Sequence, residues 1–258
     1  MILEEIAAKR RVQLAREKER TPLEEMKRLA DAARAPKDFR AALRGNRLAV
    51  IAEVKKASPS KGVICPDFHP VEIAKAYEAA GADALSILTE ESYFQGSSGY
   101  LEEIRRAVSL PILRKDFILD PYQIYEARAV GADAVLLIAA LLDARALREY
   151  AGLAKSLGLA CLMEAHNERE LAEVLEAGGT LVGVNNRDLA TFRVDLGTTA
   201  RLAKRVPEGC VLVSESGVSA RRDMRALRSA GADAVLIGET LMRSADPAKT
   251  LHDLRDGL

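Results

Sequence analysis

One short pattern recurs along the chain and constrains its fold more than any other feature. It occurs as AAGADALSIL from residue 79, AVGADAVLLI from 129 and SAGADAVLIG from 229, with a looser copy, EAGGTLVGVN, from 176. In each copy a helical stretch ends at a glycine, which adopts a left-handed conformation without steric cost, and a short apolar run follows. These glycines are Gly81, Gly131, Gly178 and Gly231. The pattern predicts repeated helix-to-strand units.

The segments between the copies supply further strands. Amphipathic helical patterns such as HPVEIAKAYEAAG and DPYQIYEARAVG alternate with apolar runs that are suited to fully buried strands. These runs lie near residues 48–54, 84–88, 110–114, 134–138, 159–163, 181–184, 210–214 and 234–237. Eight strand–helix units whose strands are apolar on both faces predict an α/β protein with a parallel sheet covered by helices. Closed on itself, that sheet is the (β/α)8 TIM barrel, whose usual size is about 250 residues.

An open doubly wound sheet is the alternative, and it is disfavoured because no GxGxxG follows the first strand. We expect residues 1–258 to form a single barrel domain with residues 1–47 as a helical N-terminal extension. Residues 2–20 predict an exposed charged helix, and residues 21–34 predict a second helix with a capping box from Thr21 to Glu24. The sequence leaves open whether this extension closes the bottom of the barrel or covers the active-site mouth.

Composition excludes several classes of function. Lys plus Arg and Asp plus Glu both number 38, and this zero net charge argues against general capture of nucleic acid or membranes. The longest apolar run, residues 134–142, is too short to span a bilayer, and the N-terminus lacks a secretory signal. Three widely spaced cysteines without CxxC predict a cytoplasmic location. The scattered His69, His166 and His252 are expected at the surface or in turns, so no metal is expected.

Polar side chains gather where the predicted strands end, which is where a TIM barrel carries its chemistry. A single strand-end Lys or Glu is ordinarily a solvated loop residue, but five strands that end this way together, with both charge signs, indicate a site. The residues at the ends of these five strands are Glu53, Lys55, Arg114, Lys115, Asp116, Glu164, Asn185, Asn186, Arg187, Ser214, Glu215, Ser216 and Gly217, and the eighth strand adds Gly238 and Glu239.

Alternation of side chains along each strand predicts which of these residues face inward. Glu53 and Lys55 share a direction with Ile51, and Glu215 shares one with Val213. If these alternate positions of each strand face inward, the strand-end side chains all point into the barrel mouth. Clustered Lys and Glu side chains shift one another's pKa values, which suits acid–base catalysis.

Small residues after the last two strands predict a phosphate site. SESGV and IGET expose backbone N–H groups where this fold often binds phosphate, and a helix N-terminus follows each. Ser58 and Ser60, after the first strand, add candidate hydroxyl donors. The residues alone thus indicate a barrel enzyme that binds a phosphorylated small molecule and transfers protons with lysine acids and glutamate bases.

Six motifs closely resemble the indole-3-glycerol phosphate synthase family. They run in order from about Phe39 to Arg243: IAEVKKASPSKG, LRKDFILDPYQI, MEAHNERE, VGVNNRDLATF, SESGV and VLIGETLM. The combination of EVKxxSPS, KDF and NNRDL is highly specific for this family. The resemblance implies a carboxy-lyase of tryptophan biosynthesis that converts 1-(2-carboxyphenylamino)-1-deoxyribulose 5-phosphate into indole-3-glycerol phosphate without cofactor or metal.

The resemblance also implies roles for the site residues. Asn185 and Arg187 match residues that orient the substrate or its carboxylate, and Glu215 matches a polar residue near the sugar hydroxyls. Lys115 matches the acid that protonates the ketone, and Lys55 matches a contact to the substrate carboxylate that shares the acid role in dehydration. Glu164 and Glu53 match the bases, although the motifs do not decide which lysine and which glutamate act at each step. The implied catalytic residues are Glu53, Lys55, Lys115, Glu164, Asn185, Arg187 and Glu215.

A second implied set binds the substrate. The phosphate cradle comprises Ser58, Ser216, Gly217 and Gly238, and the apolar wall for the anthranilate ring comprises Pro59, Phe94, Phe117, Leu136 and Leu189. For the two leucines, plain core packing is an equal alternative. Position 239 is Ser in some members of the family. Here Glu239 is expected to donate only its backbone N–H to the phosphate, with its carboxylate turned away from it.

Two other interpretations are weaker. A sugar-phosphate isomerase such as phosphoribosylanthranilate isomerase is expected to use a Cys/Asp or Asp/Asp pair on strands one and seven, where this chain has Glu53 and Glu215. A non-catalytic barrel would have lost the Lys–Glu cluster, which is intact. A monomer is expected because the sequence shows no additional apolar interface, and association with other tryptophan-pathway enzymes stays open.

Overall fold

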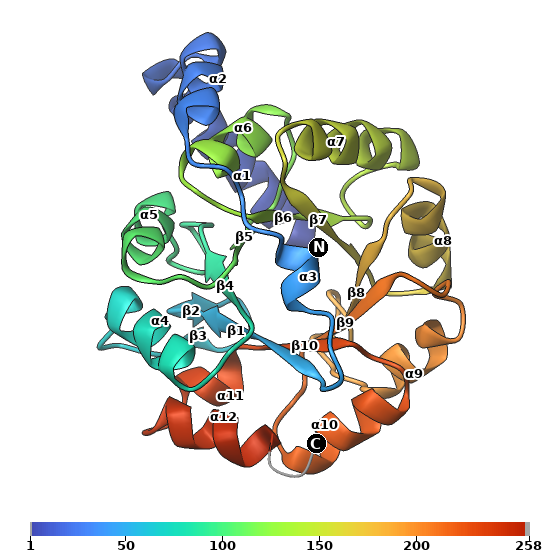
Figure 1. Ribbon diagram of the computed structural model, residues 1–258. Helices are drawn as coiled ribbons and strands as arrows, with labels where there is room; N and C mark the ends of the chain where they lie inside the picture. Colours follow the sequence, from blue (N-terminus) through green and yellow to red (C-terminus); the bar gives the residue numbers. More distant parts are fainter. Residues whose placement is uncertain (1, 256–258) are drawn as a thin grey trace.

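Eight parallel strands form a closed barrel in the computed structural model, which describes residues 2–255 (Figure 1). Going round the barrel, each strand pairs with the next in chain order, and the last pairs with the first. The strands are β1 (Ala49–Val54), β4 (Ala84–Leu88), β5 (Ile112–Lys115), β6 (Ala134–Ile138), β7 (Ala160–Ala165), β8 (Leu181–Asn185), β9 (Val211–Glu215) and β10 (Ala234–Ile237). The barrel and all eight expected strands are confirmed.

The strands are buried on both faces, which explains their continuous apolar runs. One set of side chains fills the barrel interior and includes Ile51, Leu113, Leu162 and Val213. The alternate set packs against the surrounding helices. The inward residues lie two positions before polar strand ends such as Glu53, so the predicted parity is confirmed.

Helices surround the barrel and follow its strands (Figure 1). The repeated glycines Gly81, Gly131, Gly178 and Gly231 have φ of 79°, 88°, 87° and 96°, as expected for left-handed helix ends. The helices are α4 (Pro70–Ala79), α5 (Ser98–Ala107), α6 (Tyr122–Ala129), α7 (Ala144–Ser156), α8 (Glu168–Glu176), α9 (Gly197–Ala203), α10 (Arg221–Ser229), α11 (Glu239–Met242) and α12 (Pro247–Arg255).

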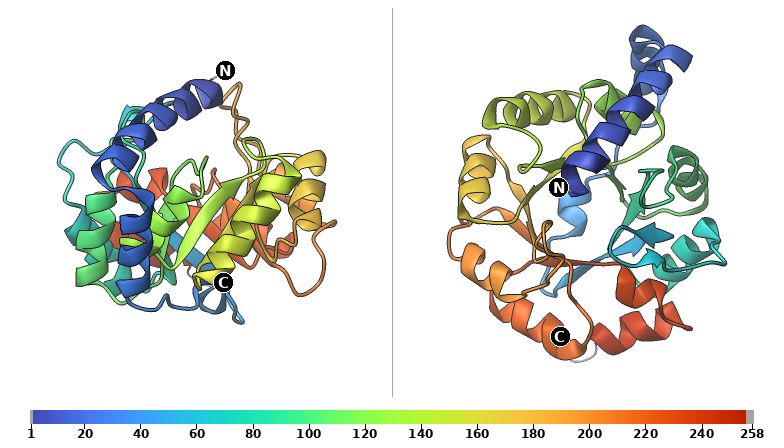
Figure 2. Two further views of the ribbon diagram at one scale, coloured as in Figure 1. Left: turned by 90° about the horizontal axis from the view of Figure 1, so that it is seen from above. Right: turned by 180° about the vertical axis from the view of Figure 1, so that it is seen from behind.

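The N-terminal segment covers both ends of the barrel. It forms α1 (Ile2–Arg20), α2 (Leu23–Ala32) and α3 (Phe39–Ala42). Figure 2 shows α1 across one end and the short α3 at the other. Phe39 and Leu43 are completely buried against the interior residues at the amino ends of the strands. The two placements considered from the sequence therefore both occur, each in a different helix.

Two expectations for this segment are wrong. The capping box does not form: α2 begins at Leu23 without a side-chain cap, and Thr21 instead donates its backbone N–H to Glu17 at 2.9 Å, which extends the last turn of α1. The α1 helix is also not simply exposed, because Arg10 in its centre is completely buried.

A small hairpin after β1 completes the mouth of the barrel. Its strands are β2 (Ala57–Ser58) and β3 (Gly62–Val63), which pair in antiparallel fashion. The tip carries Pro59, Ser60 and Lys61 over the carboxyl ends of the barrel strands. Its predicted polar donors are thus held by a defined turn.

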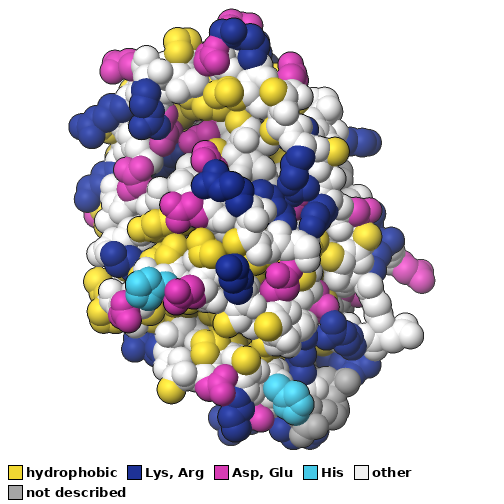
Figure 3. Space-filling view, turned by 60° about the vertical axis from the view of Figure 1, so that its left-hand side comes forward, with side chains coloured by type: hydrophobic (Ala, Val, Ile, Leu, Met, Phe, Trp, Pro, Cys, Tyr) yellow, Lys and Arg dark blue, Asp and Glu magenta, His cyan; other side chains and the backbone are white. Residues whose placement is uncertain are grey.

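The outer surface carries both charge signs. On the face in Figure 3, Lys and Arg side chains are interspersed with Asp and Glu. Within residues 2–255, no helix has the length and apolar character needed to cross a membrane.

Candidate active site

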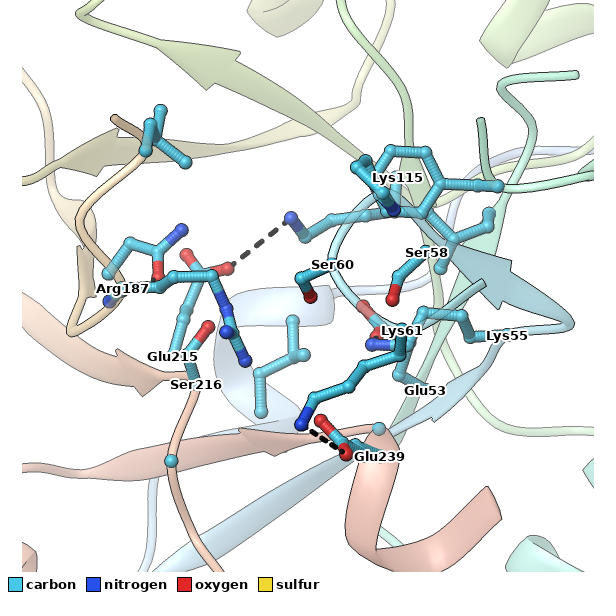
Figure 4. Close-up of a pocket in the computed structure, with 18 of the residues that line it drawn as sticks. Glu53, Lys55, Ser58, Ser60, Lys61, Lys115, Arg187, Glu215, Ser216 and Glu239 are labelled. Atoms are coloured by element: carbon cyan, nitrogen blue, oxygen red, sulfur yellow. Dashed lines mark hydrogen bonds and ion pairs between the residues drawn. The ribbon is translucent and has the colours of Figure 1, made fainter. Parts of the chain in front are cut away.

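A cavity of about 530 Å³ opens at the carboxyl ends of the strands (Figure 4). Every residue of the implied catalytic and substrate-binding sets lines it. These residues are Glu53, Lys55, Ser58, Pro59, Phe94, Lys115, Phe117, Leu136, Glu164, Asn185, Arg187, Leu189, Glu215, Ser216, Gly217, Gly238 and Glu239. Positions from residue 53 to residue 239 therefore meet in one place, although the roles assigned to them remain predictions.

The Lys115 ammonium group lies between two carboxylates. Its Nζ is 3.5 Å from Glu164 Oε2 and 3.6 Å from Glu215 Oε2, so β5, β7 and β9 each contribute one inward side chain. Burial opposes the positive charge, but the carboxylates of Glu164, Glu215 and Glu53 outweigh it and raise the pKa of Lys115. Lys115 is therefore protonated at neutral pH.

Glu164 and Glu215 hold different protonation states. Burial disfavours charge on Glu164, but Lys115, His166 and Asn185 more than compensate, and the pKa of Glu164 falls. Burial and the Glu164 charge raise the pKa of Glu215 to about 8. Among the described residues, none forms a hydrogen bond with Glu215 Oε1. At neutral pH the pair thus consists of an ionised Glu164 and a protonated Glu215.

A second lysine–glutamate pair lies on β1. Lys55 Nζ donates to Glu53 Oε1 at 2.6 Å, because side chains two apart on a strand share one face (Figure 4). Gly238, at the end of β10, lies directly against this pair. A Cβ atom there would overlap Glu53 Oε1 and lie 2.9 Å from Lys55 Nζ. Gly238 therefore has a steric role that its sequence motif did not reveal.

Asn185 and Arg187 continue the inward face of β8. Asn185 Nδ2 donates to Glu164 Oε1 at 3.3 Å, and Asn185 Oδ1 accepts the backbone N–H of Arg187 at 3.0 Å. Arg187 Nη1 donates to the carbonyl of Phe192 at 3.1 Å. These bonds fix Arg187 while its guanidinium still lines the cavity.

The expected phosphate region lies after β9 and β10. Ser216 and Gly217 have φ of 66° and 99°, so this turn adopts the left-handed conformation that glycine favours. Glu239 departs from expectation, because its carboxylate is not turned away. Its Oε1 lies 3.5 Å from Lys61 Nζ and 3.1 Å from Arg243 Nε, and Figure 4 shows Lys61 reaching it from the hairpin. Lys61 and Arg243 were missed by the sequence reasoning.

The apolar wall includes residues from α1. The rings of Phe94 and Phe117 are tilted by 41° to one another, with their centroids 5.9 Å apart. Ile2, Leu3 and Ile6 also line the cavity, and the sequence reasoning missed them. Their spacing of three and four residues along a helix was the available signal.

Arg114 and Asp116 flank Lys115 but have a structural role. Asp116 accepts Arg10 Nη2 at 3.0 Å and Arg114 Nη2 at 2.9 Å, and all three side chains are fully buried. Arg114 also donates to Glu126 of α6 at 2.7 Å. This buried network fastens α1 to the strand that carries Lys115.

His166 differs from its expected surface position. Its side chain is 11% exposed, and its Nε2 lies 3.2 Å from Glu164 Oε1. The available signal was its place two residues after Glu164, directly after the end of β7. Within residues 2–255, no group of three or more His, Cys, Asp or Glu side chains is arranged to hold a metal ion.

Comparison with known proteins identifies close relatives. The family model described as indole-3-glycerol phosphate synthase matches residues 3–254. The chain is 50% identical over 257 residues to the indole-3-glycerol phosphate synthase of Ruminiclostridium cellulolyticum, covering 99% of both chains. It is 47% identical to that of Acetivibrio thermocellus, again covering 99% of both.

Solved structures share the fold at low identity. The 3-hexulose-6-phosphate synthase of Salmonella typhimurium superposes with a TM-score of 0.66 at 15% identity, covering 81% of this chain and 97% of that one. A mutant tryptophan synthase alpha-subunit from Pyrococcus furiosus gives 0.60 at 18%, covering 80% and 97%. At these identities the likeness shows the barrel fold alone.

Proposed function

Because this chain belongs to the indole-3-glycerol phosphate synthase family, we propose that its strand-end cavity carries out that family's reaction with the residue roles given below. The enzyme is a decarboxylating carbon–carbon lyase of tryptophan biosynthesis. It converts 1-(2-carboxyphenylamino)-1-deoxyribulose 5-phosphate into indole-3-glycerol phosphate, carbon dioxide and water. The observation that carries the assignment of roles is the Lys115 ammonium between Glu164 and Glu215.

Ring closure is the first step. The ring carbon that bears the substrate carboxylate bonds to the ketone carbon, and the ketone oxygen takes a proton from Lys115 to become a hydroxyl. The two neighbouring carboxyl groups keep Lys115 protonated for this step. The bond to the carboxylate then breaks, carbon dioxide leaves, and the electron pair restores the aromatic ring.

Dehydration completes the indole. The hydroxyl leaves as water with a proton from Lys55, and Glu164 takes a proton from the adjacent CH₂ carbon. Glu164 suits the role of base because it is ionised, and Lys115 lies 3.5 Å away to recover that proton. Lys115 and Lys55 each give one proton to the substrate, and Glu164 takes one proton back. The enzyme therefore takes up one proton from solvent in each turnover, as the loss of carbon dioxide from a carboxylate requires.

The remaining cavity residues bind the substrate. Arg187 holds the substrate carboxylate, for which a guanidinium has matching bidentate geometry. The backbone N–H groups of Ser216, Gly217 and Gly238, with the Ser58 hydroxyl, hold the phosphate. Phe94, Phe117, Pro59, Leu136 and Leu189 enclose the anthranilate ring.

We also propose that the protein is cytoplasmic and monomeric. Its cysteines Cys65, Cys161 and Cys210 are all free thiols in the structure, which suits a reducing compartment. Size-exclusion chromatography with light scattering tests the monomer directly, since a dimer would elute at twice the mass of the 28.0 kDa chain.

The residue roles are tested by Lys115→Met. Purified enzyme with EDTA should form fluorescent indole-3-glycerol phosphate, and the variant should lose about 10²–10⁴-fold in kcat, the usual contribution of a general acid. KM should change little, because the apolar wall and phosphate cradle are intact. Lys56→Met is the matched control, since Lys56 points away from the cavity on the opposite strand parity. Full turnover by the Lys115 variant would remove Lys115 from its role.

A further inference from the structure

His166 joins two carboxylates that come from different elements. Its Nε2 lies 3.2 Å from Glu164 Oε1 at the end of β7, and its Nδ1 lies 2.9 Å from Glu170 Oε2 on α8. The His166 backbone N–H donates to the same Glu170 oxygen at 2.8 Å. Among the described residues, Glu164 lines the cavity and His166 does not, so His166 reaches the cavity only through Glu164.

This geometry fits a positively charged imidazole. Each ring nitrogen lies within ion-pair distance of a carboxylate oxygen. Nδ1 is hydrogen-bonded to Glu170, whereas Nε2, which forms no hydrogen bond with the described residues, is in ion-pair contact with Glu164. The positively charged imidazolium is the form that both carboxylates favour. Burial opposes that charge, but Glu164 and Glu170 raise the pKa of His166 to about 10. The other charged or titratable groups nearby are Asp188, after β8, and the Lys115 and Glu215 pair across Glu164.

The opposite side of His166 is held rigidly. Asn167 Nδ2 donates to Glu170 Oε1 at 2.6 Å, and Asn167 Oδ1 accepts the Glu170 backbone N–H at 3.0 Å at the start of α8. Glu170 is thereby fixed by hydrogen bonds to both of its oxygens. The imidazole consequently has one well-defined orientation toward Glu164.

We propose that His166 is a positioning residue for the base: its imidazolium fixes the Glu164 carboxylate through Oε1, keeps it ionised, and leaves Oε2 facing Lys115 and the substrate. The inference rests on the proposed role of Glu164. The proposal concerns which carboxyl group of the pair, Glu164 or Glu215, carries the proton. Glu164 has three polar partners and Glu215 has the shared lysine, so the proton resides on Glu215. Without the imidazolium, the proton shifts toward Glu164 and the base is lost.

The variants His166→Gln and Glu170→Gln separate this role from simple packing. His166→Gln removes the positive charge behind Glu164. We expect kcat at pH 7 to fall about 10-fold, less than the ~10²–10⁴-fold cost of losing a general base, and the acidic limb of the kcat profile to move to higher pH. Glu170→Gln leaves the imidazolium facing Glu164 alone, so the acidic limb should stay or move to lower pH. In both variants KM should remain within about 3-fold of wild type, because neither side chain contacts substrate.

The proposal is supported if the acidic limb moves to higher pH in His166→Gln but not in Glu170→Gln, since damage to packing would lower kcat at every pH in both. Glu168→Gln is the matched control, because Glu168 is on the same helix and pairs with Arg205 instead. Thermal melting checks that each variant is folded. If His166→Gln keeps the wild-type kcat and pH profile, or if both variants shift the acidic limb in the same direction, the positioning role is wrong. An inactive wild-type enzyme would instead refute the proposed residue roles as a whole.

Discussion

The buried ion pair between Arg10 and Asp116 gives the sharpest prediction about stability. Arg10 Nε and Nη2 contact the two Asp116 oxygens at 3.1 and 3.0 Å, and Nη1 donates to Glu17 at 2.8 Å. The pair joins residues that are 106 positions apart and connects α1 to the end of β5. Arg10→Met keeps a long apolar stem at this position but leaves Asp116 with one cation fewer.

The cost follows from what remains around Asp116. Removing one partner of a buried ion pair typically costs about 3–5 kcal/mol, because the other charge stays buried. Asp116 still accepts from Arg114 at 2.9 Å and from the Phe117 N–H at 2.8 Å, which favours the lower end of that range. A loss of about 3 kcal/mol in a chain of this size corresponds to a fall in Tm of about 6–12 °C.

Activity should fall together with stability. The first turns of α1 place Ile2, Leu3 and Ile6 in the cavity wall, and Asp116 is covalently adjacent to Lys115. A loosened α1 should therefore raise KM at temperatures where the barrel is still folded. Differential scanning calorimetry and steady-state kinetics at 25 °C measure the two effects separately.

Arg11→Met is the matched control for this prediction. Arg11 is the next residue on α1, it is exposed, and its loss should change Tm by less than about 2 °C. If Arg10→Met melts within 2 °C of Arg11→Met and has the wild-type KM, the buried pair does not hold α1 in place.

Two further changes test the cavity itself. Gly238→Ala places a methyl group against Glu53 Oε1, so kcat should fall at least 10-fold with little change in Tm. Gly152→Ala is the control: its added methyl group meets no atom within 4 Å, so kcat should be unchanged. Wild-type kcat/KM should decline as pH rises through about 8, because deprotonation of Glu215 puts a second negative charge beside Glu164. Glu215→Gln stays neutral at every pH, so its profile should lack that decline, and a profile that keeps it would assign the alkaline limb to another group.

The barrel was predictable because its signals are local. A glycine at a helix end followed by a buried apolar run is visible within ten residues, and each observed strand begins within two residues of its expected start. Side-chain alternation then places strand ends such as Glu53 and Lys115 on the inner face. The site could be assembled from the sequence because the barrel brings all strand ends to one mouth.

The features that were missed depend on contacts between distant segments. Nothing near Arg10 in the sequence shows that it meets Asp116, because its neighbours on α1 are charged and typical of an exposed helix. Thr21 has the spacing of a capping residue, yet tertiary packing extends α1 through it and Tyr122 donates its hydroxyl to the Thr21 carbonyl at 2.8 Å. The buried position of His166 was missed because it depends on Glu170, which only the start of α8 brings back to the strand end.

Charge balance explains why this chain can bury so many ionisable groups at one place. A buried charge is tolerated when it is paired. With Glu215 protonated, the cluster holds three cations and three anions, namely Lys55, Lys115 and His166 against Glu53, Glu164 and Glu170. In the proposed function the substrate adds a carboxylate and a phosphate, both negative, beside two further cations at the mouth, Arg187 and the Lys61 that pairs with Glu239. The incoming negative charge also makes ionisation of Glu215 less favourable, so substrate binding should raise the pKa of Glu215 and shift the alkaline limb of kcat above that of kcat/KM.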